Sequence, residues 1–235
     1  MSVHDKRMKL SLQENGFEII EDVYSKKEVD EMLQILAIKK LEHKFGVREF
    51  LVSNPEIIEN VFTEKLLAII KKVSPNTDKS VKSIYFDKPP SANWIVNWHQ
   101  DLTINVREKN EATNFKNWRV NNERTVVQPS LEILKSMFTV RIHLDDCTQE
   151  NGALRVIENS HTHGVINIKE WIKEKQGVER ICEVRKGGIV MMKPLTLHSS
   201  RRTENHTRRR VIHIEFCDQE LPKGLEWKEK INVRL

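Results

Sequence analysis

The sequence predicts a fold built mainly of β-strands, with helices on its N-terminal flank. From residue 80 onward, short apolar or alternating stretches are separated by glycine, proline and asparagine turns. The residues before this point carry apolar side chains at helical spacing instead. The chain has 235 residues, of which 38% are hydrophobic, so it can bury a sizeable core. We expect one domain over residues 1–235, with a mainly helical flank over 1–79 and a β core over 80–217, arranged as a sandwich or closed double-sheet barrel.

The N-terminal flank is expected to begin with a short strand over residues 17–23. Ser25, followed by Glu28, has the pattern of a capping box and predicts the start of a helix of about 12 residues. A second helix is expected to begin at Asn54-Pro55, and a further helical piece follows it. We found no convincing set of ligand residues in this flank, so we expect it to serve packing.

The β core is expected to contain strands at residues 81–87, 94–98, 102–106, 138–145, 154–157, 182–185, 189–192, 195–200 and 209–216, with a short helix at 168–175. Residues 107–136 show no clear element. A segment of this length is either disordered or functional. Because it closely follows His99 and Asp101, which are candidate metal ligands, we expect it to be a lid-like loop that covers or shapes the metal site.

Composition excludes several classes of protein. The formal net charge of +5 comes from 39 basic and 34 acidic residues that are mostly interleaved, so no nucleic-acid partner is expected. No apolar run approaches the ~20 residues that span a bilayer, and the first residues lack the apolar core of a signal peptide. The three cysteines are widely spaced and form no disulfide or zinc pattern. We expect a protein of a reducing compartment, the cytoplasm.

The candidate chemistry begins with the triplet His99-Gln100-Asp101. If the chain is extended here, side chains two residues apart share a face, so the imidazole of His99 and the carboxylate of Asp101 converge. A second imidazole from a distant segment would complete a facial set of two histidines and one acid, which suits non-haem iron(II) and leaves positions open for a co-substrate and oxygen. We expect His198 to supply it. Alone the triplet is a weak signal, because the chain has 9 histidines, and a strand with a surface histidine and aspartate is the alternative.

Other histidines are rival ligands by residue type. His143 lies two residues before Asp145, but Arg141 beside it would repel a cation. His161 and His163 form a His-x-His pair, although Gly164 and the polar residues around them favour an ordinary loop.

Several short stretches, in matching order and spacing from about Gly16 to Phe216, together resemble the phytanoyl-CoA dioxygenase family of iron(II)- and 2-oxoglutarate-dependent oxygenases. These stretches are Gly16-Phe17 with 19–23, Lys88-Pro89-Pro90, Trp98-His99-Gln100-Asp101, Leu144-Asp145-Asp146, Glu150-Asn151-Gly152-Ala153-Leu154, His198-Ser199-Ser200 and Arg208-Arg209-Arg210. The joint match is far more specific than the triplet alone. The resemblance implies a double-stranded β-helix, or jelly roll, with flanking helices.

The resemblance also implies roles for single residues. His99, Asp101 and His198 match the iron ligands. Arg209, eleven residues after His198, matches the arginine that binds the distal carboxylate of 2-oxoglutarate, and Ser200 matches a hydroxyl that assists it. A planar guanidinium suits this task because it clamps a carboxylate with two donors.

The match leaves points open. Arg208 and Arg210 are rivals of Arg209 by charge, although spacing and strand parity favour Arg209. The loop Glu158-Asn159-Ser160-His161 departs from the Pro-Gly-Ser-His usual in the family, which puts the shape of this loop in doubt. The presence of Asp101 argues against a halogenase, in which that acid is lost.

The function implied is hydroxylation of a C–H bond in a small molecule, with 2-oxoglutarate and O2 consumed and succinate and CO2 released. The basic cluster of Arg201, Arg202 and residues 208–210 favours an anionic substrate. Two alternatives remain: a cupin-like metalloenzyme that does not use 2-oxoglutarate, and a non-catalytic binding module on the same fold. Arg209 discriminates between them and the oxygenase, because neither alternative needs a cation there.

Overall fold

The computed structural model describes residues 11–41, 44–88, 94–110, 115–121, 124–174, 177–205 and 207–233. The proposed match at Pro89-Pro90 and the first ten residues of the helical flank lie outside these ranges. The described part is mainly β with flanking helices, and its paired strands form two facing sheets and a smaller third one. The expected fold class is confirmed, and the arrangement is that of a double-stranded β-helix.

The larger sheet supplies one wall of this fold. Its spatial order is β1 (Phe17–Ile20), β11 (Ile189–Met192), β8 (Met137–His143), β13 (Arg209–Cys217), β3 (Lys79–Lys88) and β14 (Ile231–Asn232), with β2 (Val47–Arg48) also paired to β3. All of these pairs are antiparallel. β13 lies between β8 and β3, so alternate side chains of these three strands face the opposite sheet as one surface.

The opposite wall is a four-stranded sheet in the order β10 (Glu179–Cys182), β9 (Leu154–Ile157), β12 (His198–Ser200) and β4 (Val96–His99). A cluster of buried apolar side chains joins its inner face to the larger sheet, and includes Leu154, Val156, Val190 and Met192. β10 begins and ends three residues earlier than expected from the sequence. The other strands of both walls differ from expectation mainly at their ends, because alternation of side chains marks the middle of a strand better than its limits.

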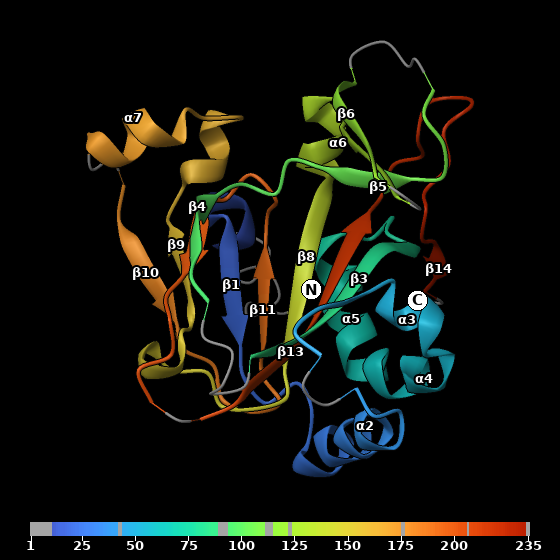
Figure 1. The fold of residues 1–235 in the computed structure, drawn as a ribbon, viewed down its shortest axis with the longest axis vertical. Coiled ribbons are helices and arrows are strands. Elements are labelled where there is room, and N and C mark those ends of the chain that lie inside the picture. Colours follow the sequence, from blue (N-terminus) through green and yellow to red (C-terminus); the bar gives the residue numbers. More distant parts are fainter. Residues whose placement is uncertain are drawn as a thin grey trace.

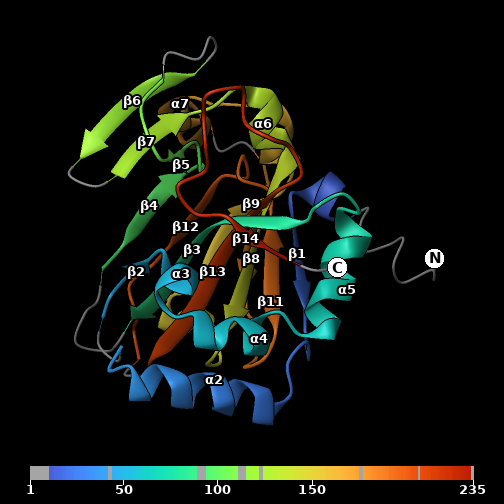
Figure 2. The same cartoon turned by 90° about the vertical axis from the view of Figure 1, so that its right-hand side faces the viewer.

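Helices cover the outer face of the larger sheet. They are α2 (Lys26–Ile38), α3 (Phe50–Ser53), α4 (Ile58–Val61) and α5 (Glu64–Val73), and all four lie on one side of that sheet in Figures 1 and 2. The expected capping box starts α2: Ser25 accepts a hydrogen bond from the backbone N–H of Glu28, whose side chain bonds back to Ser25. The largest apolar cluster fills the space between these helices and the sheet. No helix in the described ranges has the length and apolar character needed to cross a bilayer.

The expectation of an irregular segment at residues 107–136 is wrong. Within it lie β6 (Lys116–Asn121), β7 (Arg124–Gln128) and α6 (Leu131–Ser136), and β5 (Ile104–Val106) pairs with β7 to form a three-stranded sheet. This sheet and α6 lie at the end of the molecule opposite α2 in both views (Figures 1 and 2). A bulge hides the strand pattern of β6: the register shifts between Lys116 and Arg119, and Asn117 takes φ +54°.

Candidate metal centre

Strand pairing brings the two candidate histidines together. β12 pairs with β4, and the register sets His198 directly opposite His99. Paired residues point to the same face of a sheet, so both imidazoles face the inner side of the four-stranded wall. Their ring centroids lie 4.1 Å apart. Residues 99 positions apart in the chain thus become neighbours through a single strand pair.

Gln100 holds the chain between the two ligands of the triplet. Its side-chain amide donates to the carbonyls of Gly164 (2.8 Å) and Leu195 (2.6 Å), and its oxygen accepts from the backbone N–H of Ile166 (3.1 Å). The N–H of Asp101 then donates to the carbonyl of Pro194 at 2.9 Å. Because Gln100 points away from the cavity, the residues on both sides of it point into the cavity.

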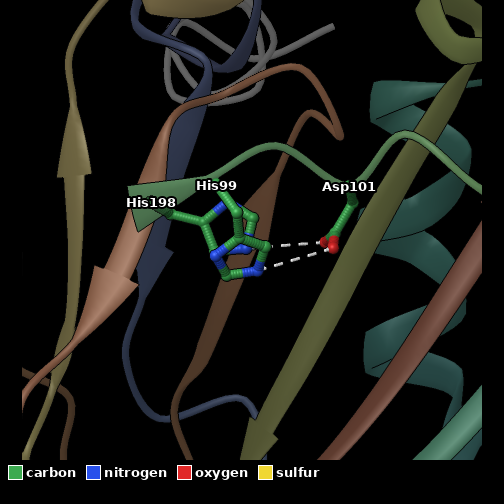
Figure 3. A group of neighbouring side chains, drawn as sticks. All are labelled: His99, Asp101 and His198. Carbon is green, nitrogen blue, oxygen red and sulfur yellow. Dashed lines mark ion pairs between the residues drawn. The ribbon is translucent and has the colours of Figure 1, made fainter. Parts of the chain in front are cut away.

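His99, Asp101 and His198 converge as expected. The Nε2 atoms of His99 and His198 lie 3.8 Å and 3.6 Å from the two carboxylate oxygens of Asp101, as Figure 3 shows. One candidate ligand atom from each residue lies within 4.8 Å of the other two. His198 is buried, whereas the side chains of Asp101 and His99 are 24% and 37% exposed, so the centre opens to the cavity on the His99 side.

A hydrogen bond at the other ring nitrogen, Nδ1, fixes the tautomer of each imidazole. The Nδ1 atoms of His99 and His198 lie 2.8 Å from the carbonyl oxygens of Asn97 and Thr196. A carbonyl only accepts, so Nδ1 carries the proton in both rings and the lone pair of each neutral ring is on Nε2. This is the arrangement in which histidine binds metals, with the other nitrogen held by a backbone carbonyl.

The charge states also suit a cation. Burial lowers the pKa of His198 to about 4, against the raising effect of Asp101, so His198 is neutral at pH 7. Burial alone would raise the pKa of Asp101, but the electrostatic interactions with His198, with the ammonium of Lys82 and with the histidines nearby hold it well below its usual value. The neutral imidazole of His198 and the carboxylate of Asp101 therefore face a common point with the imidazole of His99.

The three residues fit a divalent transition metal. A cation with bonds of about 2.1 Å, the length found for imidazole on zinc, can touch two atoms up to about 4.2 Å apart. The observed separations of 3.6 Å and 3.8 Å fall within this limit. All three ligands come from one side, which leaves the cavity side open, as in the two-histidine, one-carboxylate sites of non-haem iron enzymes.

The rival histidines do not join this group. His143 is buried with neither ring nitrogen hydrogen-bonded to a described residue, and burial holds its pKa well below the usual value. His161 is bonded through Nε2 to the carbonyl of Gln13. Among the described residues, neither belongs to a cluster able to hold a metal ion.

The departing loop at residues 158–161 supports the centre. Asn159 takes a left-handed conformation (φ +62°), which asparagine tolerates well. The hydroxyl of Ser160 donates to the carbonyl of Ile157 and accepts from the N–H of Leu197, the residue before the buried ligand His198.

Sequence reasoning missed a second cluster. Lys82, Arg141, His213 and Glu215 form a hydrogen-bonded row beside Asp101, and Asp101, His213 and Glu215 meet the same distance criterion for a metal site. The ammonium of Lys82 lies 2.6 Å from Glu215, so a cation there would meet a positive charge already in place. The alternation of residues 209–216 does put His213 and Glu215 on the face of Arg209, and that pattern was the available signal.

The three consecutive arginines at the start of β13 have different partners: Arg208 lies just before the strand, and Arg209 and Arg210 are its first residues. Arg208 binds Asp87, and Arg210 binds both carboxylate oxygens of Asp145. Arg209 is 7% exposed, and its Nε is buried without a hydrogen-bond partner in the described ranges. Its side chain hydrogen-bonds the thiol of Cys147, and no described acid forms an ion pair with it. This guanidinium is therefore available to an anion.

A cavity of about 220 Å³ contains the candidate centre. His99, Asp101 and His198 line it together with Arg209, and Ser200 lines the same wall. Five cationic side chains line the cavity: Arg48, Lys82, Lys88, Arg141 and Arg209. The acids among the lining residues are Asp101 and Glu215. The cavity is therefore suited to negatively charged molecules.

Solved structures share this fold. The epimerase SnoN in complex with Fe3+, alpha ketoglutarate and nogalamycin RO aligns with a TM-score of 0.72 at 13% identity, over 99% of this chain and 96% of that one. AviO1 from Streptomyces viridochromogenes Tue57 gives 0.68 at 16% identity, over 94% and 98%. EctD from S. alaskensis with bound Fe gives 0.69 at 13% identity, over 92% and 76%. At these identities the likeness establishes the fold. No curated protein sequence matches the chain.

The family assignment rests on the amino-acid sequence. The model of the family described as phytanoyl-CoA dioxygenase (PhyH) matches residues 12–211, which include the candidate centre and Arg209. The match covers most of the chain and agrees with the resemblance found from short stretches. The chain therefore belongs to the phytanoyl-CoA dioxygenase family.

Proposed function

We propose that the protein is an iron(II)- and 2-oxoglutarate-dependent oxygenase that oxidises a small molecule, and that the reaction is a hydroxylation. The observation that carries this proposal is the convergence of His99, Asp101 and His198 in one cavity with Arg209, which has no acid partner in the described part of the chain. Family membership supports it, as do the Fe3+ and alpha ketoglutarate bound to the similarly folded SnoN.

Each residue has a distinct task in this proposal. His99 and His198 offer their Nε2 lone pairs, and Asp101 offers a carboxylate oxygen, to one iron ion. Arg209 receives the distal carboxylate of 2-oxoglutarate, and Ser200 stands on the cavity wall as a second donor. When bound, iron supplies the oxygen chemistry that couples decarboxylation of 2-oxoglutarate to oxidation of the substrate. The chain positions these groups in one cavity.

The two alternative functions require different subsets of these residues. A metalloenzyme that does not use 2-oxoglutarate needs the three ligands but has no use for a buried, unpaired Arg209. A non-catalytic binding module needs neither the three metal ligands nor Arg209. Retention of both features in one cavity favours the oxygenase. The cytoplasmic location remains a prediction, and the three cysteines, which are all free thiols, agree with it.

The test is release of succinate from 2-oxoglutarate in air, with and without added iron(II), during a screen of small carboxylates and phosphates. The wild-type protein should release succinate only with iron, and one class of compound should increase the rate. His99→Ala should remove this activity while the protein stays folded.

His163→Ala is the matched control, because His163 is exposed and does not line the cavity. It should behave as wild type. Succinate release by His99→Ala at the wild-type rate would show that the proposed centre is not the site of reaction.

A further inference from the structure

A row of four polar side chains crosses the cavity face of the larger sheet. Lys82 on β3 donates to Glu215 on β13 at 2.6 Å. Nε2 of His213 lies 3.2 Å from the same carboxylate oxygen. A terminal nitrogen of Arg141 on β8 lies 3.0 Å from Nδ1 of His213. All four line the cavity that contains the candidate metal centre.

The direction of each hydrogen bond follows from the chemistry of its groups. A guanidinium only donates, so Nδ1 of His213 accepts from Arg141. The proton of the His213 ring is then on Nε2 and is donated to Glu215. His213 is therefore neutral, and the charge of Glu215 is balanced by Lys82. The row orients Arg141 but does not neutralise it.

Arg141 is a partly buried cation without an acid partner among the described residues. Its guanidinium lies 5.9 Å from the ring centre of Phe86, and its Nε is buried with no described hydrogen-bond partner. Burial, followed by the nearby charge of Arg209, lowers the pKa of Arg141 to about 10. The charge of Asp101 acts in the opposite direction, but that carboxylate is committed to the metal centre. A partly buried charge in this state is stabilised when an anion reaches it.

When the charges of the loaded site are added up, no described acid balances the charge of Arg141. One iron(II), Asp101 and the two carboxylates of 2-oxoglutarate together carry a single negative charge, which Arg209 balances. Lys82 and Glu215 balance each other. Arg48 is exposed to water, and Lys88 donates to the carbonyl of Arg201 at 2.7 Å. Arg141 and the buried Lys88 remain as positive charges that face the cavity without an acid partner among the described residues, and of the two only Arg141 offers a planar fork of N–H donors.

We propose that Arg141 binds an anionic group, a carboxylate or a phosphate, of the primary substrate, and so selects small anions for this site. The inference rests on the proposed function, since the balance of charges includes iron and 2-oxoglutarate. His213 and Glu215 act as positioning residues that hold the guanidinium toward the cavity. The volume of about 220 Å³ restricts the part of the substrate that enters to a compact group. 2-Oxoglutarate offers the same carboxylate chemistry, so the test must separate the two sources.

The test uses the full chain, iron(II) and calorimetry without oxygen. 2-Oxoglutarate is titrated first, and inorganic phosphate is then titrated into the loaded protein as the anionic probe. Phosphate should bind the wild type, and Arg141→Met should weaken it by at least about tenfold, because a charge-assisted fork of hydrogen bonds is lost. Arg141→Lys, which keeps the charge without the fork, should weaken it by about threefold. Both variants should keep the affinity for 2-oxoglutarate.

Arg180→Met is the matched control. The Arg180 side chain is 56% exposed, pairs with Glu158 and does not line the cavity, so its loss should leave phosphate binding unchanged. Acetate and acetamide give a second comparison on the wild type, which does not depend on a variant that folds. Acetate should compete with phosphate, and acetamide should not.

Four results would overturn the proposal. In the first, phosphate binds Arg141→Met as tightly as wild type; if that variant does not fold, Arg141→Lys is compared instead. In the second, phosphate does not bind the wild type at all. Acetamide could compete as well as acetate. Arg141→Met could weaken 2-oxoglutarate as much as Arg209→Met does, which would give Arg141 to the co-substrate. Failure of the proposed function is seen separately, as absence of iron-dependent 2-oxoglutarate binding, and phosphate is then titrated into the protein alone.

Discussion

Three consecutive arginines at the start of β13, Arg208 just before it and Arg209 and Arg210 on it, share a charge but differ in their surroundings. Arg208 and Arg210 reach Asp87 and Asp145, while Arg209 faces the cavity without an acid partner among the described residues. Strand alternation explains the difference, because the side chain of Arg209 points to the face opposite that of its two neighbours. The proposed co-substrate clamp is therefore a property of strand position.

Arg209→Met and Arg210→Met should separate binding from stability. Arg209→Met should weaken iron-dependent 2-oxoglutarate binding by about 10- to 100-fold, the range for a lost hydrogen bond to a charged group. Arg210→Met should leave that binding unchanged and lower the free energy of unfolding by about 1–3 kcal/mol, since Asp145 loses its partner. Calorimetry and urea unfolding measure the two effects. Equal loss of 2-oxoglutarate affinity in both variants would contradict the assignment.

Glu229 gives a prediction about pH. Burial raises its pKa from 4.5 to about 7, against hydrogen bonds from the N–H and hydroxyl of Ser83. The folded state therefore holds a proton that the unfolded state releases at lower pH. This contribution to stability is complete below pH 4.5 and is lost as the pH rises to about 7.

Glu229→Gln keeps a neutral side chain at every pH, so it should remove this loss. The unfolding free energy of the variant relative to wild type should rise between about pH 4.5 and 7, by up to about 3 kcal/mol. Urea unfolding at a series of pH values measures the difference. A constant difference across this range would show that Glu229 is charged in the folded state.

Residue patterns predicted the candidate metal ligands but not the row beside them. The spacing of His99 and Asp101, and the short stretches around His198 and Arg209, are local and can be read directly. The row of Lys82, Arg141, His213 and Glu215 depends on which strands lie side by side. Pairing of His213 with Arg141 is set by the register of β13 on β8, which no local pattern contains.

At the scale of elements, the sequence located most strands but failed for the β6–β7 hairpin. β7 does alternate, with Thr125 and Val127 buried. β6 lies at the edge of its sheet and carries polar side chains and a bulge, so its apolar period is lost. The extended chain expected around residues 99–101 does not continue as a strand: β4 ends at His99, and hydrogen bonds of Gln100 hold the chain before Asp101.

Gly152 offers a test of a turn that borders the cavity. It has φ +79°, and an added Cβ would lie 2.6 Å from the backbone oxygen of Arg201 and 3.3 Å from Nζ of Lys88. Gly152→Ala should cost about 1–3 kcal/mol of unfolding free energy, since the strained conformation and the backbone contact act together. Urea unfolding checks this value.

Gly46→Ala is the matched control, because the added Cβ meets only the ring of Phe86, at 3.9 Å. Its effect should stay within about 0.5 kcal/mol. Equal effects of the two alanines would mean that the turn at Gly152 relaxes without cost.

At the scale of the whole molecule, the helical flank and the β core share one apolar cluster. Phe216 on β13 stacks on Phe138 of β8, with ring centroids 5.0 Å apart, and meets Phe62 at the end of α4 edge-on at 6.3 Å. The strand that carries Arg209 on its cavity face thus carries Phe216 on its other face. Composition and helical spacing predicted both layers, whereas the contact between them depends on the assembled fold.

Phe216→Ala should lower the unfolding free energy by about 3–5 kcal/mol, through lost burial and the cavity left behind. Guanidinium unfolding followed by circular dichroism measures the change. Ile38→Ala is the control, because Ile38 is 71% exposed, and its effect should stay within about 0.5 kcal/mol. A small effect of Phe216→Ala would show that the flank does not depend on this contact.

The most direct test of the candidate centre is equilibrium dialysis of 2-oxoglutarate against the protein without oxygen, with and without iron(II). The wild-type protein should bind one 2-oxoglutarate per chain with an affinity that rises when iron is added. Asp101→Ala should bind equally with and without the metal. Binding by the wild type that does not respond to iron, or the same response in Asp101→Ala, would contradict the assignment of His99, Asp101 and His198 as one iron site.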